Sequence, residues 1–383
     1  MKRYFIFQFA QFGDCLYATI IAKQIKHDDP NSHITWGIST RHKSILLGNP
    51  HVDEVMDLGI DPATMTQEDL DAMYTKIREI ASSNEFAEVI HLQIHDKHLL
   101  AFCTTLRQTV FKVCGRPITV DVRPVVNLTS QEKENVTRFV EANHLSSFKH
   151  VILFECAPSS QQSKVNVDFA FEVARKLTAE DREACFILTS PNSLPSIGDQ
   201  IIDASSLTFR ENLELINNCT LLIGCSSGIT WLSTAESAKK IPMIQLLNRE
   251  SQIFAGVNFD FQIHNLVNRH IIELTDFTVD DVIECIKSTF LIGVESTKIK
   301  WNQDYRPSYF NLECNLLRLV WLGYPVTQLY DYTDRFIVEN AKYGNVLAIG
   351  RFQITKLIIF CYLKRIIFKL KVGLKPIRAL VGI

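Results

Sequence analysis

The sequence lacks the short motifs that would assign a function directly. It has ten cysteines but no Cys-x-x-Cys pair, which excludes a zinc ribbon and a dithiol redox motif. No Gly-x-Gly-x-x-Gly or Walker pattern is present, and this weakens a dehydrogenase or NTPase interpretation. The formal net charge of −2 gives no basic excess that would attract nucleic acid. We therefore expect no nucleic-acid partner, and reduced thiols in a cytoplasmic protein.

Long apolar runs are also missing. No segment approaches the roughly 20 apolar residues of a membrane-spanning helix, and residues 1–9 form a strand pattern without a signal-peptide cleavage site. After Glu339 there is no acidic residue, whereas eight lysines and arginines follow from Arg351 to Arg378. Residues 345–383 then either bind an anionic membrane surface at the inner face of the cytoplasmic membrane or pack on the body with their lysines directed outward. The charge of a single sign favours the membrane.

Strand and helix patterns alternate through the first 290 residues, which is typical of parallel sheets covered by helices. Thr208 and Glu211 form a capping-box pattern that predicts a helix start in the second half. The alternation is interrupted between about residues 117 and 150, where Pro117, Pro124 and a charged helix intervene. We predict an α/β domain over residues 1–148, a second over 149–293, and an aromatic and basic extension over 294–383. The sequence indicates strands at residues 4–9, 33–38, 88–92, 151–154, 184–189, 221–224 and 241–247.

Asp14 follows the first predicted strand and opens an apolar helix pattern. In an open α/β sheet the carboxyl end of a strand is where ligands bind, so this carboxylate is expected at the mouth of a cleft. There it could accept a proton from a substrate hydroxyl. It could instead cap the helix expected at residues 15–26.

The segment Gly224-Cys225-Ser226-Ser227-Gly228 also lies between a strand and a helix. The free amides at a helix start bind phosphate, and small residues let a ligand approach. The other interpretation is a serine-capped helix with a glycine for close packing. Lys164, in the loop after the first strand of the second domain, lies at the same sheet edge. Its ammonium could neutralise a diphosphate, or it could be an ordinary solvated surface charge.

Two further patterns carry less weight. Asp69-Leu70-Asp71 matches an acid-x-acid metal motif, but it lies in an acidic helix pattern and favours a solvated face. His91, His95 and His98 gather at a strand exit, where we favour a polar lining over a zinc site. We therefore expect no bound metal.

The residues around Gly13 and Asp14 resemble the start of the bacterial heptosyltransferases, glycosyltransferase family 9. The strand of Trp36 and the run from Asn49 to Val55 are similar to that family, as is the run from Asn212 to Pro242. The similarity covers about residues 4–290. It implies a GT-B architecture, in which two Rossmann-like domains face a central cleft and hold the acceptor and the nucleotide-sugar donor respectively.

The resemblance also implies site residues. Asp14 matches the catalytic base, and Gly13 belongs to the acceptor-side loop. Lys164 matches a lysine near the donor phosphates, and Ser160 of the same loop is expected in the donor site.

The family's donor-site run matches Ser226, Ser227 and Gly228. This sequence departs from the family at two of its positions. Ser226 stands where the family has an acid, and Trp231 stands where it has a histidine. A carboxylate that would hold sugar hydroxyls is thus replaced, and we expect Trp231 to offer an aromatic platform to the donor.

These observations favour a metal-independent, inverting glycosyltransferase. It would move heptose or a related sugar from a nucleotide diphosphate sugar to lipopolysaccharide or another lipid-linked or cell-surface glycan, with no cofactor beyond that co-substrate. Two alternatives stay open. One is a non-catalytic protein of the same fold that binds nucleotides or glycans, and the other is a sugar-nucleotide epimerase.

Overall fold

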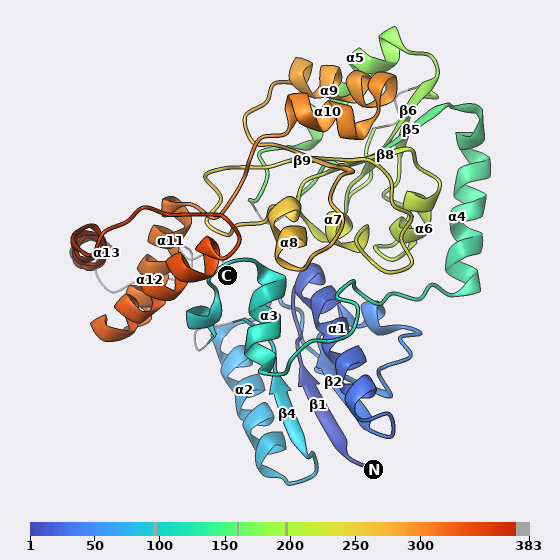
Figure 1. The fold of residues 1–383 in the computed structure, drawn as a ribbon. Helices are drawn as coiled ribbons and strands as arrows, with labels where there is room; N and C mark the ends of the chain where they lie inside the picture. The colour runs from blue at the N-terminus through green and yellow to red at the C-terminus, as the bar shows by residue number, and fades with distance from the viewer. Residues whose placement is uncertain (95–97, 159–160, 196–197, 373–383) are drawn as a thin grey trace.

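The computed structural model describes residues 1–94, 98–158, 161–195 and 198–372, and two parallel sheets form its centre (Figure 1). Sheet A has the strand order β3-β2-β1-β4. Tyr4 of its central strand is in register with Ile34 on one side and Glu88 on the other. Its strands are β1 (Arg3–Phe7), β2 (His33–Ile38), β3 (Glu54–Asp57) and β4 (Glu88–His91).

Sheet B has the strand order β10-β9-β8-β5-β6-β7, again with every pair parallel. Its side chains are almost all buried, which explains why its strands are continuous apolar runs without alternation. Its strands are β5 (His150–Glu155), β6 (Ala184–Thr189), β7 (Ile201–Asp203), β8 (Leu221–Gly224), β9 (Met243–Leu246) and β10 (Ile271–Leu274).

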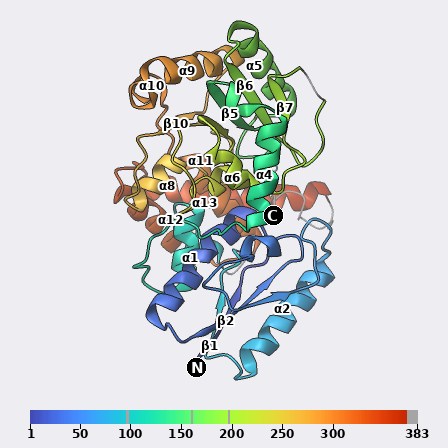
Figure 2. The ribbon, with the colours of Figure 1, turned by 90° about the vertical axis from the view of Figure 1, so that its right-hand side faces the viewer.

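Helices connect the strands and cover both faces of each sheet (Figures 1 and 2). The two faces of β1 show how the sequence directs this, because Tyr4 and Ile6 pack with one helix layer while Phe5 and Phe7 pack with the other. The helices around sheet A are α1 (Phe12–Asp28), α2 (Gln67–Ser82) and α3 (Leu106–Cys114), with the short 3-10 helices η1 (Lys43–Leu46) and η2 (Leu99–Ala101). Those around sheet B are α4 (Ser130–Ala142), η3 (Leu145–Ser147), α5 (Val167–Glu180), α6 (Glu211–Asn217), α7 (Gly228–Leu232), α8 (Val257–Ile263), α9 (Val279–Ile292) and α10 (Val294–Trp301).

The predicted fold class, two Rossmann-like α/β domains, is confirmed. Two helices pack against a different domain from the one to which the sequence assigns them. Helix α4, assigned by sequence to the first domain, packs against α6 of the second (Figure 1). Helix α10, assigned to the extension, packs against α9 and β10.

The carboxyl ends of the strands in the two sheets face one another, and the two domains are in contact there (Figure 2). One apolar cluster runs from Ile6 and Leu16 in the first domain to Leu222 and Trp231 in the second. Phe12 of α1 and Phe209, which precedes α6, lie with ring centroids 4.3 Å apart. At this point the facing edges are therefore sealed by side chains.

Arg210 of the second domain links it to the first domain through hydrogen bonds. Its side chain is buried, and its Nε donates to Oε1 of Glu132 over 2.6 Å. Its Nη1 donates to the carbonyl of Leu47 over 2.9 Å, and its Nη2 donates to the carbonyl of Asn127 over 2.5 Å. Although burial alone would raise it, the Arg210 guanidinium and the hydrogen bonds of Thr129 lower the pKa of Glu132 to about 2.

We expect Arg210→Leu to lower the free energy of unfolding by about 3–5 kcal/mol, because it leaves the Glu132 carboxylate and several carbonyls without their donor. Urea unfolding followed by circular dichroism measures the change. Arg182→Leu is the matched control, since Arg182 is exposed and makes no ion pair among the described residues. A cost for Arg210→Leu no larger than that of the control would contradict the role of Arg210 in joining the domains.

The basic hydrophobic extension forms helices α11 (Tyr309–Trp321), α12 (Val326–Ala341) and α13 (Arg351–Val372). They lie beside the junction of the two domains (Figure 1). Tyr332 donates to the carbonyl of Phe102 over 2.6 Å, and Asn340 donates to that of Cys103 over 2.8 Å. The extension is therefore packed on the body. Within the part of the chain that the structure describes, no helix is long and apolar enough to span a bilayer.

Candidate functional site

Asp14 lies where the two sheets face each other. Helix α1 begins at Phe12 immediately after the loop that follows β1, and Gln11 at its N-cap has φ 68°. Asp14 is therefore inside the first turn, and it makes no capping hydrogen bond, so the capping interpretation is wrong. Its carboxylate is half-buried and has no hydrogen-bond or ion-pair partner among the described residues. Burial raises its pKa from 3.8 to about 7.

The first turn of α1 packs directly against α7 of the second domain. A Cβ added at Gly13 would lie 3.4 Å from Cδ1 of Trp231. A Cβ added at Gly228 would lie 3.3 Å from Cβ of Phe12 and 2.8 Å from Cε2 of Phe209. The structure thus brings together the two loops that sequence reasoning selected, about 200 residues apart. A Cβ at Gly228 would be too close to Phe209, whereas a Cβ at Gly13 would make an ordinary contact.

The turn between β8 and α7 is filled by a carboxylate from the chain itself. Glu155, at the carboxyl end of β5, is 2% exposed and accepts from the amides of Cys225 (2.8 Å) and Ile229 (2.9 Å). It also accepts from the hydroxyls of Ser227 (2.7 Å) and Thr230 (2.6 Å). The amides of Ser227 and Thr230 also donate to the Glu155 carboxylate, over longer distances.

Glu155 therefore occupies the amides that we predicted to bind donor phosphate. An anion is favourable at this helix start for the reason given above, but the chain supplies its own. Ser227 and Gly228 are consequently part of an internal turn, Ser227 through its bonds to Glu155 and Gly228 through its packing. The predicted phosphate site at the α7 amides is wrong.

Ser226 is also used internally. It is buried, has φ 58°, and donates its hydroxyl to the carbonyl of Ala255. Its amide donates to the hydroxyl of Thr230 over 3.1 Å. The side chain that replaces the family's acid thus holds the following loop in place, and the prediction that Ser226 binds the donor has no support from this geometry.

Trp231 is 5% exposed and lies in the apolar cluster between the domains. Its ring meets the ring of Tyr17 edge to face, with centroids 5.3 Å apart. The expected aromatic platform for a sugar is therefore wrong. The indole at this position packs against Gly13.

Among the described residues, Lys164 is the one predicted donor residue that is exposed rather than buried or partly buried. It is 62% exposed, and its Nζ lies 3.3 Å from Oε2 of Glu250, which follows β9. The carbonyl of Gln162 accepts from the amide of Asn248 over 2.8 Å, which holds the two loops together at the carboxyl edge of sheet B. Ser160 lies outside the described residues.

A buried polar network lies on the inner side of Asp14. Arg107 of α3 and Asp260 of α8 form an ion pair with Nε and Oδ2 3.1 Å apart, and both are at most 1% exposed. The Arg107 guanidinium lies 5.1 Å from the centroid of Tyr17, one turn after Asp14 on α1. Burial, together with the Asp260 carboxylate, raises the pKa of Tyr17. This network joins the two domains immediately behind the candidate base.

Sequence reasoning missed Glu155, Arg107 and Asp260. Glu155 carried a usable signal, because a carboxylate at the end of an apolar strand is the same pattern that selected Asp14. Arg107 and Asp260 lie in ordinary amphipathic helix patterns and carried none.

No group of His, Cys, Asp and Glu among the described residues could hold a metal. Asp69 accepts from the amide and hydroxyl of Thr66 in the capping box of α2, so the acid-x-acid pattern belongs to a helix start. His91 and His98 stack edge to face with ring centroids 4.9 Å apart, whereas His95 lies outside the described residues.

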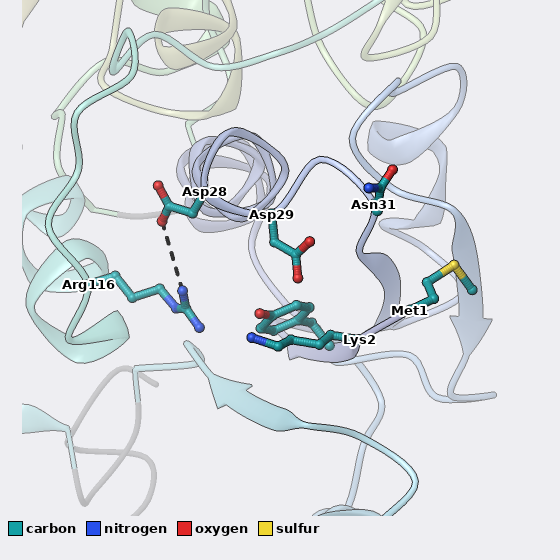
Figure 3. A pocket seen from close by; sticks show the side chains of 7 residues that line it. Met1, Lys2, Asp28, Asp29, Asn31 and Arg116 are labelled. Carbon is teal, nitrogen blue, oxygen red and sulfur yellow. Dashed lines mark ion pairs between the residues drawn. The ribbon is translucent and has the colours of Figure 1, made fainter.

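The cavity drawn in Figure 3 is at the opposite end of sheet A. It has a volume of about 660 Å³ and lies beside the amino end of β1 and the carboxyl end of α1. Lys2, Asp28, Asp29 and Arg116 line it, and Arg116 pairs with Asp28 over 3.9 Å and with Glu88. Asp14 is in the first turn of α1, whereas the cavity lies beside the last turn. The cavity is therefore separate from the candidate site.

No protein-family model matches this sequence, and no curated protein matches it. Solved structures do match the fold. The family 9 glycosyl transferase from Veillonella parvula superposes with a TM-score of 0.55 at 15% identity, over 78% of this chain and 96% of that one. The ADP-heptose lipopolysaccharide heptosyltransferase II of E. coli superposes with a TM-score of 0.51 at 13% identity, over 76% and 99%. The chain therefore has the GT-B fold of these glycosyltransferases.

Proposed function

We propose that this protein is a glycosyltransferase that uses Asp14 as its catalytic base. The observation that carries the proposal is the Asp14 carboxylate, which has no partner among the described residues and has a pKa of about 7, at the point where the strand ends of both domains meet. A base works best when its pKa is near the working pH. The named activities of the matching structures support the same reaction class.

In this proposal Asp14 takes the proton of an acceptor hydroxyl while that oxygen attacks the anomeric carbon from the face opposite the leaving group. The anomeric bond to the nucleoside diphosphate breaks, and the configuration inverts. The donor sugar is heptose or a related sugar, and the acceptor is lipopolysaccharide or another lipid-linked glycan. The matching E. coli ADP-heptose lipopolysaccharide heptosyltransferase II supports this choice. We assign no metal to the step.

The leaving diphosphate needs positive charge, and Lys164 is the residue that can supply it. The α7 amides are occupied by Glu155. The pairing of Lys164 with Glu250 is exposed, and such a surface pair contributes only about 0–1 kcal/mol. A diphosphate can therefore replace the Glu250 carboxylate at little cost and gain a stronger charge-assisted bond.

We expect Lys164→Gln to weaken binding of a nucleoside diphosphate by about tenfold, the effect of one charge-assisted hydrogen bond. Glu250→Gln should strengthen binding about two- to threefold, because it removes the competing carboxylate. Calorimetry with ADP, GDP and UDP measures both. Lys176→Gln is the control, since Lys176 is also exposed and also paired, with Glu172 and Asp280. Equal affinities in all four proteins would remove Lys164 from the donor site.

One observation favours a second candidate, a non-catalytic binder of nucleotides or glycans. Glu155 and Trp231 fill the space where we expected the donor phosphates and the sugar. The test is a panel of nucleotide sugars with lipid-linked and lipopolysaccharide acceptors, in which release of nucleoside diphosphate is measured. Acceptor-dependent release supports transfer, whereas tight binding without release across the panel supports the binder.

A further inference from the structure

Helix α13 is apolar on two opposite sides. Its inner side packs on α11 and α12, where it buries side chains spaced three and four residues apart. This spacing forms one stripe along a helix. The residues of the inner stripe, all at most 3% exposed, are Ile354, Leu357, Ile358 and Cys361.

The outer side carries a second apolar stripe that no described residue covers. At 100° per residue it lies opposite the inner stripe. A continuous apolar stripe on a helix is normally buried, so we expect a surface outside the described residues to cover the outer stripe. Its residues are Phe352 (72% exposed), Ile359 (53%), Phe360 (44%), Leu363 (50%), Ile366 (53%) and Ile367 (50%).

The charge around the outer stripe is of one sign. Arg351 and Lys356 are exposed and have no carboxylate partner among the described residues. The Lys356 ammonium lies 4.3 Å from the centroid of the Phe352 ring, within the stripe itself. Lys364 pairs with Glu313 of α11 over 2.8 Å, so it is already neutralised. The chain has no acidic residue after Glu339.

The exposed apolar surface continues past the start of α13. The segment before the helix leaves Val346 74% exposed. This segment and the first turn of α13 line a cavity of about 340 Å³ together with Tyr309 of α11. The surface is therefore broader than the helix alone.

We propose that the outer stripe of α13 lies in the headgroup region of an anionic lipid bilayer, parallel to the membrane plane. Apolar side chains flanked by lysine and arginine are what such interfacial helices present to lipid. A second copy of this chain fits less well, because a symmetric contact would bring Lys356 and Arg351 of both copies to the same positive face. The helix lies on the membrane without crossing it, in agreement with its hydropathy.

The test uses the full chain and vesicles of phosphatidylcholine with or without phosphatidylglycerol, followed by sedimentation. We expect binding to the anionic vesicles, loss of binding at high salt, and at least a tenfold loss for the double variant Ile359→Gln/Leu363→Gln. Lys356→Gln should lose about fivefold, the effect of one cation near an anionic surface. The control is Leu291→Gln/Ile299→Gln, in which two apolar residues of α9 and α10 that are more exposed than Ile359 and Leu363 are replaced.

Thermal melting of each variant checks that it is folded, and the single variant Phe352→Gln, at the first turn of α13, replaces the double variant if that one is not. The proposal is overturned if the wild type does not bind anionic vesicles, or if the α13 variants bind as well as the control. It is also overturned if the wild type is a dimer that the α13 variants dissociate. None of these results depends on sugar transfer, so they test the surface separately from the proposed function.

Discussion

Asp14→Asn is expected to abolish sugar transfer, with a loss of about 10²–10⁴-fold in kcat, while the fold is retained. An amide is nearly the same size as the carboxylate but cannot accept the proton of the acceptor hydroxyl. Release of nucleoside diphosphate from the best donor of the panel measures the loss. Asp168→Asn is the matched control, because Asp168 is exposed in the first turn of α5 after the loop that follows β5. Retained turnover in Asp14→Asn would remove Asp14 from the role of base.

The raised pKa of Asp14 also predicts how the stability of Asp14→Asn, relative to the wild type, changes with pH. In the unfolded chain this group ionises near pH 3.8, and in the folded protein near pH 7. Between these values the folded state must bind a proton that the unfolded state has released, so the free energy of unfolding falls as the pH rises. The Asp14→Asn variant has no titrating group at this position, so it does not lose this free energy of unfolding as the pH rises. Its melting temperature relative to the wild type should therefore rise between pH 4 and 7 and then level off.

Glu155→Ala is expected to lower the free energy of unfolding by about 3–5 kcal/mol, the second large effect. It removes the acceptor of the amides of Cys225 and Ile229 and of the hydroxyls of Ser227 and Thr230, in a turn whose residues are buried or partly buried. Urea unfolding measures the change. Glu183→Ala is the control, since its side chain is 66% exposed and pairs only with Lys149 at the surface.

Added inorganic phosphate separates the anion role of Glu155 from simple packing. In Glu155→Ala the amides at the start of α7 are free, and an anion can take the place of the carboxylate. Phosphate should therefore raise the melting temperature of Glu155→Ala more than that of the wild type or of Glu183→Ala. An equal rise in the melting temperature of all three proteins would mean that the turn does not bind an anion selectively.

The elements that the sequence predicts well are those decided by neighbouring residues. The predicted strand at 4–9 and the helix after it depend on apolar spacing within a few residues, and β1 and α1 follow that spacing. The Thr208 and Glu211 pattern is present as reciprocal bonds, with the Thr208 amide donating to Glu211 over 2.7 Å. The order of the seven predicted strands was therefore available before any tertiary contact, whereas the short strands β7 and β10 were not predicted.

The parts that the sequence did not predict depend on residues far apart in the chain. The amides after β8 look free in sequence, and only the neighbouring position of β5 in sheet B brings Glu155 to them. Trp231 looks like a ligand platform until Gly13 and Tyr17 of the other domain are placed against it. A family pattern identifies where such residues lie, but the neighbours decide what they contact.

The Arg210 hydrogen bonds and the apolar cluster that both domains share limit how far the two domains can separate. They therefore limit how a substrate could reach Asp14. Separating the two sheets would expose that cluster to water and remove the carbonyl partners of the Arg210 guanidinium, which costs several kcal/mol. The structure therefore favours substrate entry along the surface of the domain junction over a wide separation of the two sheets.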